Sequence, residues 1–108
     1  MRKLGLIGGM SWFSTRTYYE HINRLVQKAK GPQSSAPMLI ESLDFAQMMR
    51  LSSEEDWARA SKVLQASAKR LEKAGATAVI IGANSMHRVH DKVAASVSVP
   101  IIHIADCV

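Results

Sequence analysis

The stretch AVIIGANSMH, residues 78–87, decides the fold of this chain. Its first four residues are apolar and mostly β-branched, and the run ends at Gly82. An amide, a hydroxyl and an imidazole then follow at Asn84, Ser85 and His87. A short apolar run is typical of a buried strand, and open α/β sheets bind ligands beyond the carboxyl ends of such strands. The stretch therefore predicts a ligand-binding edge around which the other elements are arranged.

The composition predicts one globular domain. The chain has 108 residues, of which 47% are hydrophobic, enough for a single core. No apolar run approaches the roughly 20 residues of a membrane span. Gly8-Gly9 interrupts the N-terminal apolar segment before it reaches the length of a signal peptide. The single cysteine, Cys107, permits no internal disulfide, so we expect a cytoplasmic protein.

The net charge of +5 is compatible with an anionic partner. Its lysines and arginines are spread through the chain, mostly on the polar faces of predicted helices. A nucleic-acid surface needs a clustered basic stripe, and none is visible. We therefore expect no nucleic-acid or membrane partner, and an anionic small molecule remains compatible with the charge.

Short apolar runs alternate with helical patterns along the whole chain. Strands are predicted at residues 3–7, 38–42, 76–81 and 101–104. Such alternation predicts an α/β fold, a three-layer α/β/α domain with a four-stranded parallel sheet in the order 2-1-3-4. The sequence ends soon after the fourth run, so one sheet edge and one face are expected to lack cover. Residues 1–108 are thus expected to be a single truncated domain, one half of a larger architecture, or a subunit of a homo-oligomer such as a dimer.

Three helices are predicted between these strands, each with one apolar face. The first is capped by Ser11 or Ser14, the second by a capping box of Ser52 and Glu55, and the third by Asn84 or Ser85. Gly31-Pro32 should end the first helix and Gly75 the second, and Asp44 should open a turn after the second strand. The apolar faces are residues 18, 22, 25, 26 and 29, then 57, 60, 64, 68 and 71, then 89, 93 and 97.

In a parallel sheet the strand ends bring several polar residues to one edge. Ser11, Thr15, Asn84 and Ser85 offer neutral donors there, and helix N-termini favour a carboxylate or phosphate. Each feature has a structural alternative. The serines and the asparagine can be helix caps, the glycine pair a tight turn, His87 an ordinary helix residue, His103 a core residue and Trp12 an apolar anchor.

Common nucleotide, hydrolase and metal motifs do not fit. The glycines at 5, 8 and 9 lack the third glycine of a dinucleotide fingerprint, and no Walker A lysine follows them. No serine lies in a nucleophile elbow. His87 and His90, with Asp91 beside them, do not make a convincing zinc set, so no metal is expected.

Several segments form a recognisable set in the same order along the chain. They are LIGGMSW at 6–12 followed by Ser14-Thr15 and Tyr18-Tyr19, DFA at 44–46, DW at 56–57, LEKAGA at 71–76, NSMH at 84–87 and PIIHIAD at 100–106. This set resembles the aspartate/glutamate racemase family, and the resemblance covers nearly the whole chain. It implies an isomerase of amino-acid metabolism that needs no cofactor, in particular no pyridoxal phosphate.

The resemblance also implies a two-cysteine mechanism and shows where this chain departs from it. In the family, two cysteines from two similar domains lie on opposite sides of the substrate Cα. One removes the α-proton and the other returns a proton. The first cysteine stands where this chain has Gly82, followed by Ala83, and the second belongs to a domain outside residues 1–108. Cys107 matches neither position, and Phe13 replaces a residue that is usually a carboxylate.

The expected function follows from these departures. No catalytic residue is intact, and the resemblance assigns substrate binding to Met10, Ser11, Thr15, Asn84, Ser85 and His87. We expect a truncated racemase-like protein that is inactive alone and binds an acidic amino acid or dicarboxylate weakly. The alternative is a non-catalytic module that binds such a ligand, forms a homo-oligomer or pairs with a full-length relative. A third reading is an active racemase that uses another residue.

Overall fold

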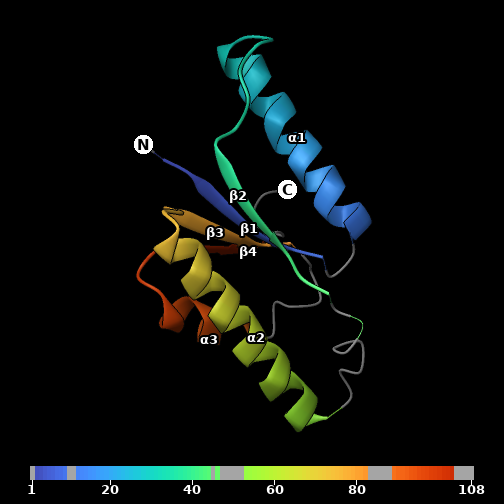
Figure 1. Ribbon diagram of the computed structural model, residues 1–108, viewed down its shortest axis with the longest axis vertical. Coiled ribbons are helices and arrows are strands. Elements are labelled where there is room, and N and C mark those ends of the chain that lie inside the picture. The colour runs from blue at the N-terminus through green and yellow to red at the C-terminus, as the bar shows by residue number, and fades with distance from the viewer. Residues whose placement is uncertain (1, 10–11, 45, 47–52, 83–88, 104–108) are drawn as a thin grey trace.

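Four parallel strands form the centre of the molecule (Figure 1). The computed structural model describes residues 2–9, 12–44, 46, 53–82 and 89–103. The strands are β1 (Leu4–Gly8), β2 (Met38–Ser42), β3 (Ala78–Ile81) and β4 (Ile101–His103), and their order is β2-β1-β3-β4. The predicted α/β class and the 2-1-3-4 order are both confirmed. β3 begins two residues later than predicted. The Thr77 backbone N–H donates to Lys3 O just before the strand, outside the regular pairing of β1 with β3.

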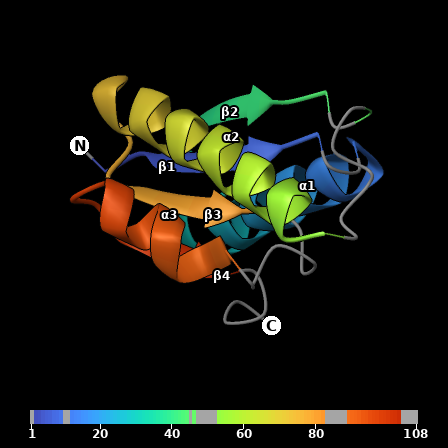
Figure 2. The same cartoon turned by 90° about the horizontal axis from the view of Figure 1, so that it is seen from below.

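Three helices cover the sheet unequally. α1 (Trp12–Lys30) lies on one face, and α2 (Glu54–Lys73) and α3 (His90–Ser96) lie on the other (Figures 1 and 2). Right-handed crossovers explain this division. The chain moves from β1 to β2 in one direction across the sheet and from β2 to β3 and β4 in the other, so the first helix falls on the opposite face from the next two.

The main core lies between the sheet and the α2–α3 layer. Ile7, Val79 and Ile81 point into it from the strands, and the predicted apolar face of α2 packs against them. Val93 of α3 is fully buried in the same cluster. A smaller cluster on the α1 side contains two buried residues, Leu6 and Ile80. Alternate strand residues therefore face the two layers, as the two-residue period of a strand requires.

The helix caps differ from the sequence prediction in register. The N-cap of α2 is Ser53, whose Oγ accepts the Asp56 backbone N–H at 3.1 Å, while Asp56 Oδ2 accepts the Ser53 N–H at 3.3 Å. The predicted box of Ser52 and Glu55 is wrong by one residue, because a serine precedes an acid by three positions in both registers.

The cap predictions for the other two helices have different outcomes. α1 begins at Trp12, so Ser14 lies within its first turn, and Ser11 lies outside the described residues. The N-cap of α3 is Val89 without a side-chain hydrogen bond, so neither Asn84 nor Ser85 caps this helix. α1 and α2 end as predicted, next to glycines with positive φ values: 116° at Gly31 and 110° at Gly75.

Two carboxylates fasten α2 to its surroundings. Arg70 donates through Nε to both oxygens of Glu41, at 3.1 and 2.9 Å, and through Nη2 to Oε1, and these hydrogen bonds lower the pKa of Glu41. Glu72 Oε2 accepts hydrogen bonds from Ser98 Oγ at 2.7 Å, Ser98 N at 2.8 Å and Val99 N at 3.2 Å. The Ser98 hydroxyl bond is the main cause that lowers the pKa of Glu72. α2 is thus tied to β2 and to the segment that enters β4.

Candidate functional site

The carboxyl ends of the strands meet at one edge of the sheet. Gly8 pairs with Ser42, Ile7 with Ile81, and Ile81 with His103. Leu43 N donates to Gly8 O at 2.9 Å, so the segments leaving β1 and β2 stay joined just beyond the strands. The expected edge of strand ends is therefore present in the described part of the chain, and ligand binding there stays a prediction.

Gly8 and Gly9 are required by the turn from β1 into α1. Gly9 has a φ of +91°, and a Cβ there would lie 1.9 Å from Leu43 O. A Cβ on Gly8 would lie 2.6 Å from Thr15 Oγ1. Positive φ and lack of space are the two conditions that only glycine meets easily. The turn interpretation of this glycine pair is confirmed.

Thr15 is the predicted binding residue that the structure describes. Its Oγ1 accepts the Gly9 backbone N–H at 2.9 Å. This bond ties Gly9, in the loop after β1, to the first turns of α1. Gly9 directly precedes Met10 and Ser11 in the sequence. The hydroxyl therefore positions the loop, and its contact with a ligand carboxylate stays a prediction.

The remaining predicted binding residues lie outside the described residues. They are Met10, Ser11, Asn84, Ser85 and His87. Asp44 does form the expected turn, since its Oδ1 accepts the Ala46 N–H at 3.0 Å. His90 is held by the backbone, with Nε2 3.0 Å from Ile101 O. Over the described ranges no three His, Cys, Asp or Glu side chains gather as a metal site.

Gly82 occupies a tight position at the end of β3. Its N–H donates to Ile7 O at 3.0 Å, which continues the pairing of β3 with β1 by one residue. A Cβ added there would lie 2.9 Å from Ile7 O and 3.2 Å from Leu6 Cδ1. The backbone φ is ordinary for an L-residue, so the obstacle is the neighbouring strand and not the local conformation. A side chain at residue 82 requires β1 and β3 to move apart slightly.

Two aromatic side chains stand exposed beside this edge. Trp12 and Phe13, in the first turn of α1, are 59% and 56% exposed and stack with ring centroids 3.8 Å apart. The Arg16 guanidinium carbon lies 5.9 and 5.7 Å from their ring centroids. Trp12 is therefore not the apolar anchor that one interpretation expected, because the first turn of α1 projects beyond the sheet edge (Figure 2).

Arg16 was not singled out from the sequence. Its spacing of four residues from Trp12 and three from Phe13 was the available signal, because such residues share one helix face. It places a permanent cation on the first turns of α1, beside an edge whose described polar side chains include the Thr15 hydroxyl and the Asp44 carboxylate. Anion binding at this edge stays a prediction. The chain's one cysteine, Cys107, lies outside the described residues.

The described elements form a doubly wound α/β domain whose strand ends meet at one edge. Residues 7–108 match the family model described as Asp/Glu/Hydantoin racemase. The chain belongs to this family.

Two solved structures show the same relationship. One is of a proposed Asp/Glu racemase from Yersinia pestis, with 42% identity and a TM-score of 0.90. The other is of an aspartate racemase homologue from Pyrococcus horikoshii, with 34% identity and a TM-score of 0.82. Each match covers 98% of this chain and 46% of the solved chain. The chain thus spans about half the length of these relatives.

Proposed function

We propose that this chain provides the substrate-orienting half of a racemase-family site and does not itself exchange the α-proton of an amino acid. The ligand is an acidic amino acid or a dicarboxylate. Its carboxylate would meet the edge formed by the loops after β1 and β3. Ser11, Thr15, Asn84 and Ser85 are the proposed donors, with Met10 and His87 beside them. Binding would be weak, because half of a cleft encloses little of the ligand.

The proposal of inactivity rests on the identity of residue 82, which is a glycine. Racemisation by the mechanism that the family resemblance implies needs a thiolate on one side of Cα and a thiol on the other. Glycine can neither accept nor donate a side-chain proton. The space that a side chain would use at this position is bounded by Ile7 O and Leu6. A cysteine at this position would therefore need β1 and β3 to shift slightly.

Solvent-deuterium exchange tests this proposal directly. The chain is incubated in deuterated buffer with L-aspartate or L-glutamate, and deuterium at Cα is measured by mass spectrometry. We expect no exchange above a protein-free blank. Exchange that depends on the chain's concentration would contradict the proposal.

A matched pair of variants sharpens the test. Gly82→Cys adds the thiol, and Gly82→Ala adds the same Cβ without sulfur. We expect neither to racemise substrate, because the cysteine of the second domain is still missing. Racemisation by the Cys variant, with none by the Ala variant, would show that one thiol at this position suffices.

Ligand binding can be measured separately from turnover. Chemical-shift titration with aspartate, glutamate and succinate should move the Gly8 and Gly9 amide signals, with Thr15→Ala weakening the response. A titration in which these signals stay fixed while others move would place the ligand elsewhere.

A second candidate function is an interaction module, favoured by the unburied face of α1. Homo-oligomerisation is one form of it, and light scattering over a concentration series measures it.

The part of the chain that the structure describes has no helix long and apolar enough to cross a bilayer. A cytoplasmic location, supported by the low cysteine content, stays a prediction.

A further inference from the structure

β2 is an outermost strand of the sheet, on the side away from β3 and β4. Among the described elements, β1 is the strand that pairs with it. β2 has five residues, whereas β4 at the opposite margin has three. An outermost strand presents a row of backbone N–H and C=O groups that can pair with another chain, and proteins commonly protect such an edge by shortening or charging it. The outer edge of β2 is long enough to accept a further strand.

The hydrogen bonds at the two ends of β2 show which residues face this outer edge. Leu4 N donates to Pro37 O at 3.2 Å, and Leu43 N donates to Gly8 O at 2.9 Å. Pro37 and Leu43 thus bond to β1, and because alternate residues of a strand face the same neighbour, the other odd-numbered residues of β2 do so as well. The even-numbered residues direct their N–H and C=O groups outward, and they are Met38, Ile40 and Ser42.

Two residues that commonly block an exposed edge do not act on the outer edge of β2. Pro37 occupies a position that faces β1, so its missing N–H leaves the outer row of donors intact. Glu41 is the charged residue of β2, and its carboxylate accepts a hydrogen bond from Arg70 Nε at 2.9 Å on the α2 side of the sheet. This pair compensates the charge of Glu41 and fastens the strand. The outer edge is therefore preformed and carries no net charge.

Ile40 lies at the centre of the outward-facing residues and exposes its side chain. It is 40% exposed, and within the described ranges it is the strand residue among the exposed large hydrophobic side chains. Met38, two residues earlier, packs against the small cluster of Leu6 and Ile80 on the α1 side. Because side chains two apart share a face, Ile40 lies on that side too, at the margin of the sheet. An exposed β-branched side chain in this place suits a cross-strand pair.

We propose that the outer edge of β2 pairs with the same edge of a second copy of this chain, in an antiparallel register centred on Ile40. A twofold axis there sets Ile40 opposite the partner's Ile40, and Met38 opposite the partner's Ser42. These residues all face outward, so each opposed pair exchanges two backbone hydrogen bonds. Two four-stranded sheets thereby join into one continuous sheet, with an isoleucine pair at the joint.

The symmetry of this edge favours a second copy over an unrelated extended peptide. The outward-facing residues are spaced evenly about Ile40, so the edge matches itself without a shift in register, as a twofold contact requires. The helices leave room for the contact. α1 and α2 both pack most closely over β1, and two copies of β1 would lie about 14 Å apart across the joint, three strand spacings. Neither helix therefore stands between the two edges.

This pairing gives a surface to the homo-oligomer of the second candidate function, on which it rests. It needs no ligand at the strand ends, so the deuterium-exchange and ligand-titration results do not bear on it.

Site-specific cross-linking tests the register. In a Cys107→Ser background, Ile40→Cys sets two thiols opposite each other with Cα atoms about 5.5 Å apart, within the range of a disulfide. Ser42→Cys is the matched control, because the two copies of residue 42 would lie about 13 Å apart. After mild oxidation we expect a covalent dimer of the Ile40→Cys variant and little of the Ser42→Cys variant. Equal cross-linking of the two variants, or none in Ile40→Cys, would overturn the proposed register.

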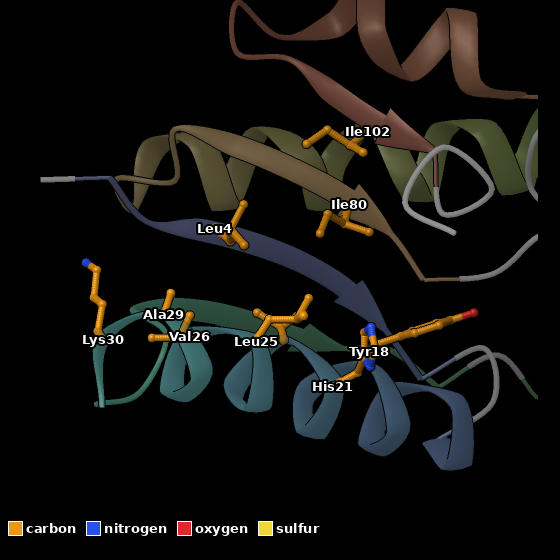
Figure 3. A pocket seen from close by; sticks show the side chains of 10 residues that line it. Leu4, Tyr18, His21, Leu25, Val26, Ala29, Lys30, Ile80 and Ile102 are labelled. Atoms are coloured by element: carbon orange, nitrogen blue, oxygen red, sulfur yellow. The ribbon is translucent and has the colours of Figure 1, made fainter. Parts of the chain in front are cut away.

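A different apolar surface supplies the control for a second test. A groove of about 520 Å³ lies between α1 and the sheet, and Figure 3 shows Leu25 and Val26 of α1 along it, across from Ile80 of β3. Leu25 is 54% exposed, somewhat more than Ile40. Leu25→Lys and Ile40→Lys therefore make the same chemical change at two exposed apolar positions, one on α1 and one on the β2 edge.

Light scattering over a concentration series measures the dimer in both variants, and circular dichroism checks that they are folded. We expect Ile40→Lys to raise the dissociation constant about tenfold or more, since two lysines would oppose each other across the axis. Leu25→Lys should leave it unchanged. A dimer that survives Ile40→Lys would overturn the β2 contact and leave the interaction module standing. A parent chain that stays monomeric throughout would overturn both.

Discussion

α1 and α2 are two amphipathic helices of nearly equal length on opposite faces of one sheet. α1 has 19 residues and buries none, whereas α2 has 20 residues and buries six. Their sequences show the same helical repeat of apolar residues, and both lie against parallel strands. The two helices differ in the elements that they pack against. α2 meets a full sheet face and α3, whereas α1 borders an open groove. An apolar stripe predicts which side of a helix is suited to packing against other elements. It does not show that such packing is present.

The two helices also differ in how they are fixed. α2 has a capping box at Ser53, an ion pair with β2 and a carboxylate that binds the chain before β4. For α1, the clearest tertiary hydrogen bond runs from Ala36 N to Asn23 Oδ1, at 2.8 Å. α2 therefore belongs to the cooperative core, whereas α1 is held by a smaller apolar cluster.

The largest expected contrast comes from removing one leucine from each helix. Leu64→Ala in α2 should lower the free energy of unfolding by about 2–5 kcal/mol, because Leu64 is fully buried. Leu25→Ala in α1 should change it by less than about 0.5 kcal/mol. Urea unfolding followed by circular dichroism measures both. Equal losses would mean that α1 is as well packed in solution as α2.

A smaller effect is expected where β3 faces α1. Gly82→Ala should cost about 1–3 kcal/mol, because the added carbon meets Ile7 O at 2.9 Å and Leu6 Cδ1 at 3.2 Å. The same carbon lies 3.6 Å from Tyr18 of α1, an ordinary contact. Gly31→Ala is an informative control, since it has open space but a φ of +116°. No loss in Gly82→Ala would show that the strands separate easily on the α1 side.

The cap of α2 offers a further comparison. Ser53→Ala should lower stability by about 1 kcal/mol, because the Asp56 N–H loses its acceptor. Ser14→Ala in the first turn of α1 should have little effect, since Ser14 is not an N-cap there. Thermal unfolding of both variants checks this. A larger loss in Ser14→Ala than in Ser53→Ala would contradict the assigned cap.

The smallest effect should appear only in acid. The pKa of Glu72 is lowered by its hydrogen bonds to Ser98, so its stabilising contribution is present above the usual glutamate value of about 4.3. That contribution is lost as the pH falls through the lowered value. Glu72→Gln should therefore flatten the stability curve below about pH 4.3. Glu20→Gln, on exposed α1, is the control and should leave the curve nearly unchanged. A Glu72→Gln curve parallel to that of the parent chain would mean that this carboxylate does not anchor α2.

Much of the fold could be read from local patterns. The apolar runs at Leu4, Met38, Val79 and Ile101 fall in strands, and Gly31 and Gly75 end helices as expected. The crossover rule then gave the strand order. The cap of α2 was missed because Ser52 and Ser53 each precede an acid by three residues. The structure distinguishes them, because the reciprocal hydrogen bonds join Ser53 and Asp56.

The candidate site, like the fold, was predicted from the sequence only in part. Its segments follow strand ends, so Gly8, Gly9 and Gly82 were placed at one edge from the sequence. The family resemblance marked Gly82 as the position of the missing cysteine, and the family membership itself is confirmed. The spacing of Trp12, Phe13 and Arg16 indicated a shared helix face, but the exposure of the two rings could not be foreseen, because it depends on how far α1 extends beyond the sheet.

The sequence by itself determined the elements, their order, the apolar face of each helix and the absence of a thiol at residue 82. These follow from short-range periodicity and residue identity. The tertiary structure decided that a Cβ at residue 82 would meet Ile7 O at 2.9 Å, so that a side chain there needs the strands to shift, and that no residue of α1 is buried. Both depend on the distance between elements remote in the sequence. A local pattern carries no information about that distance.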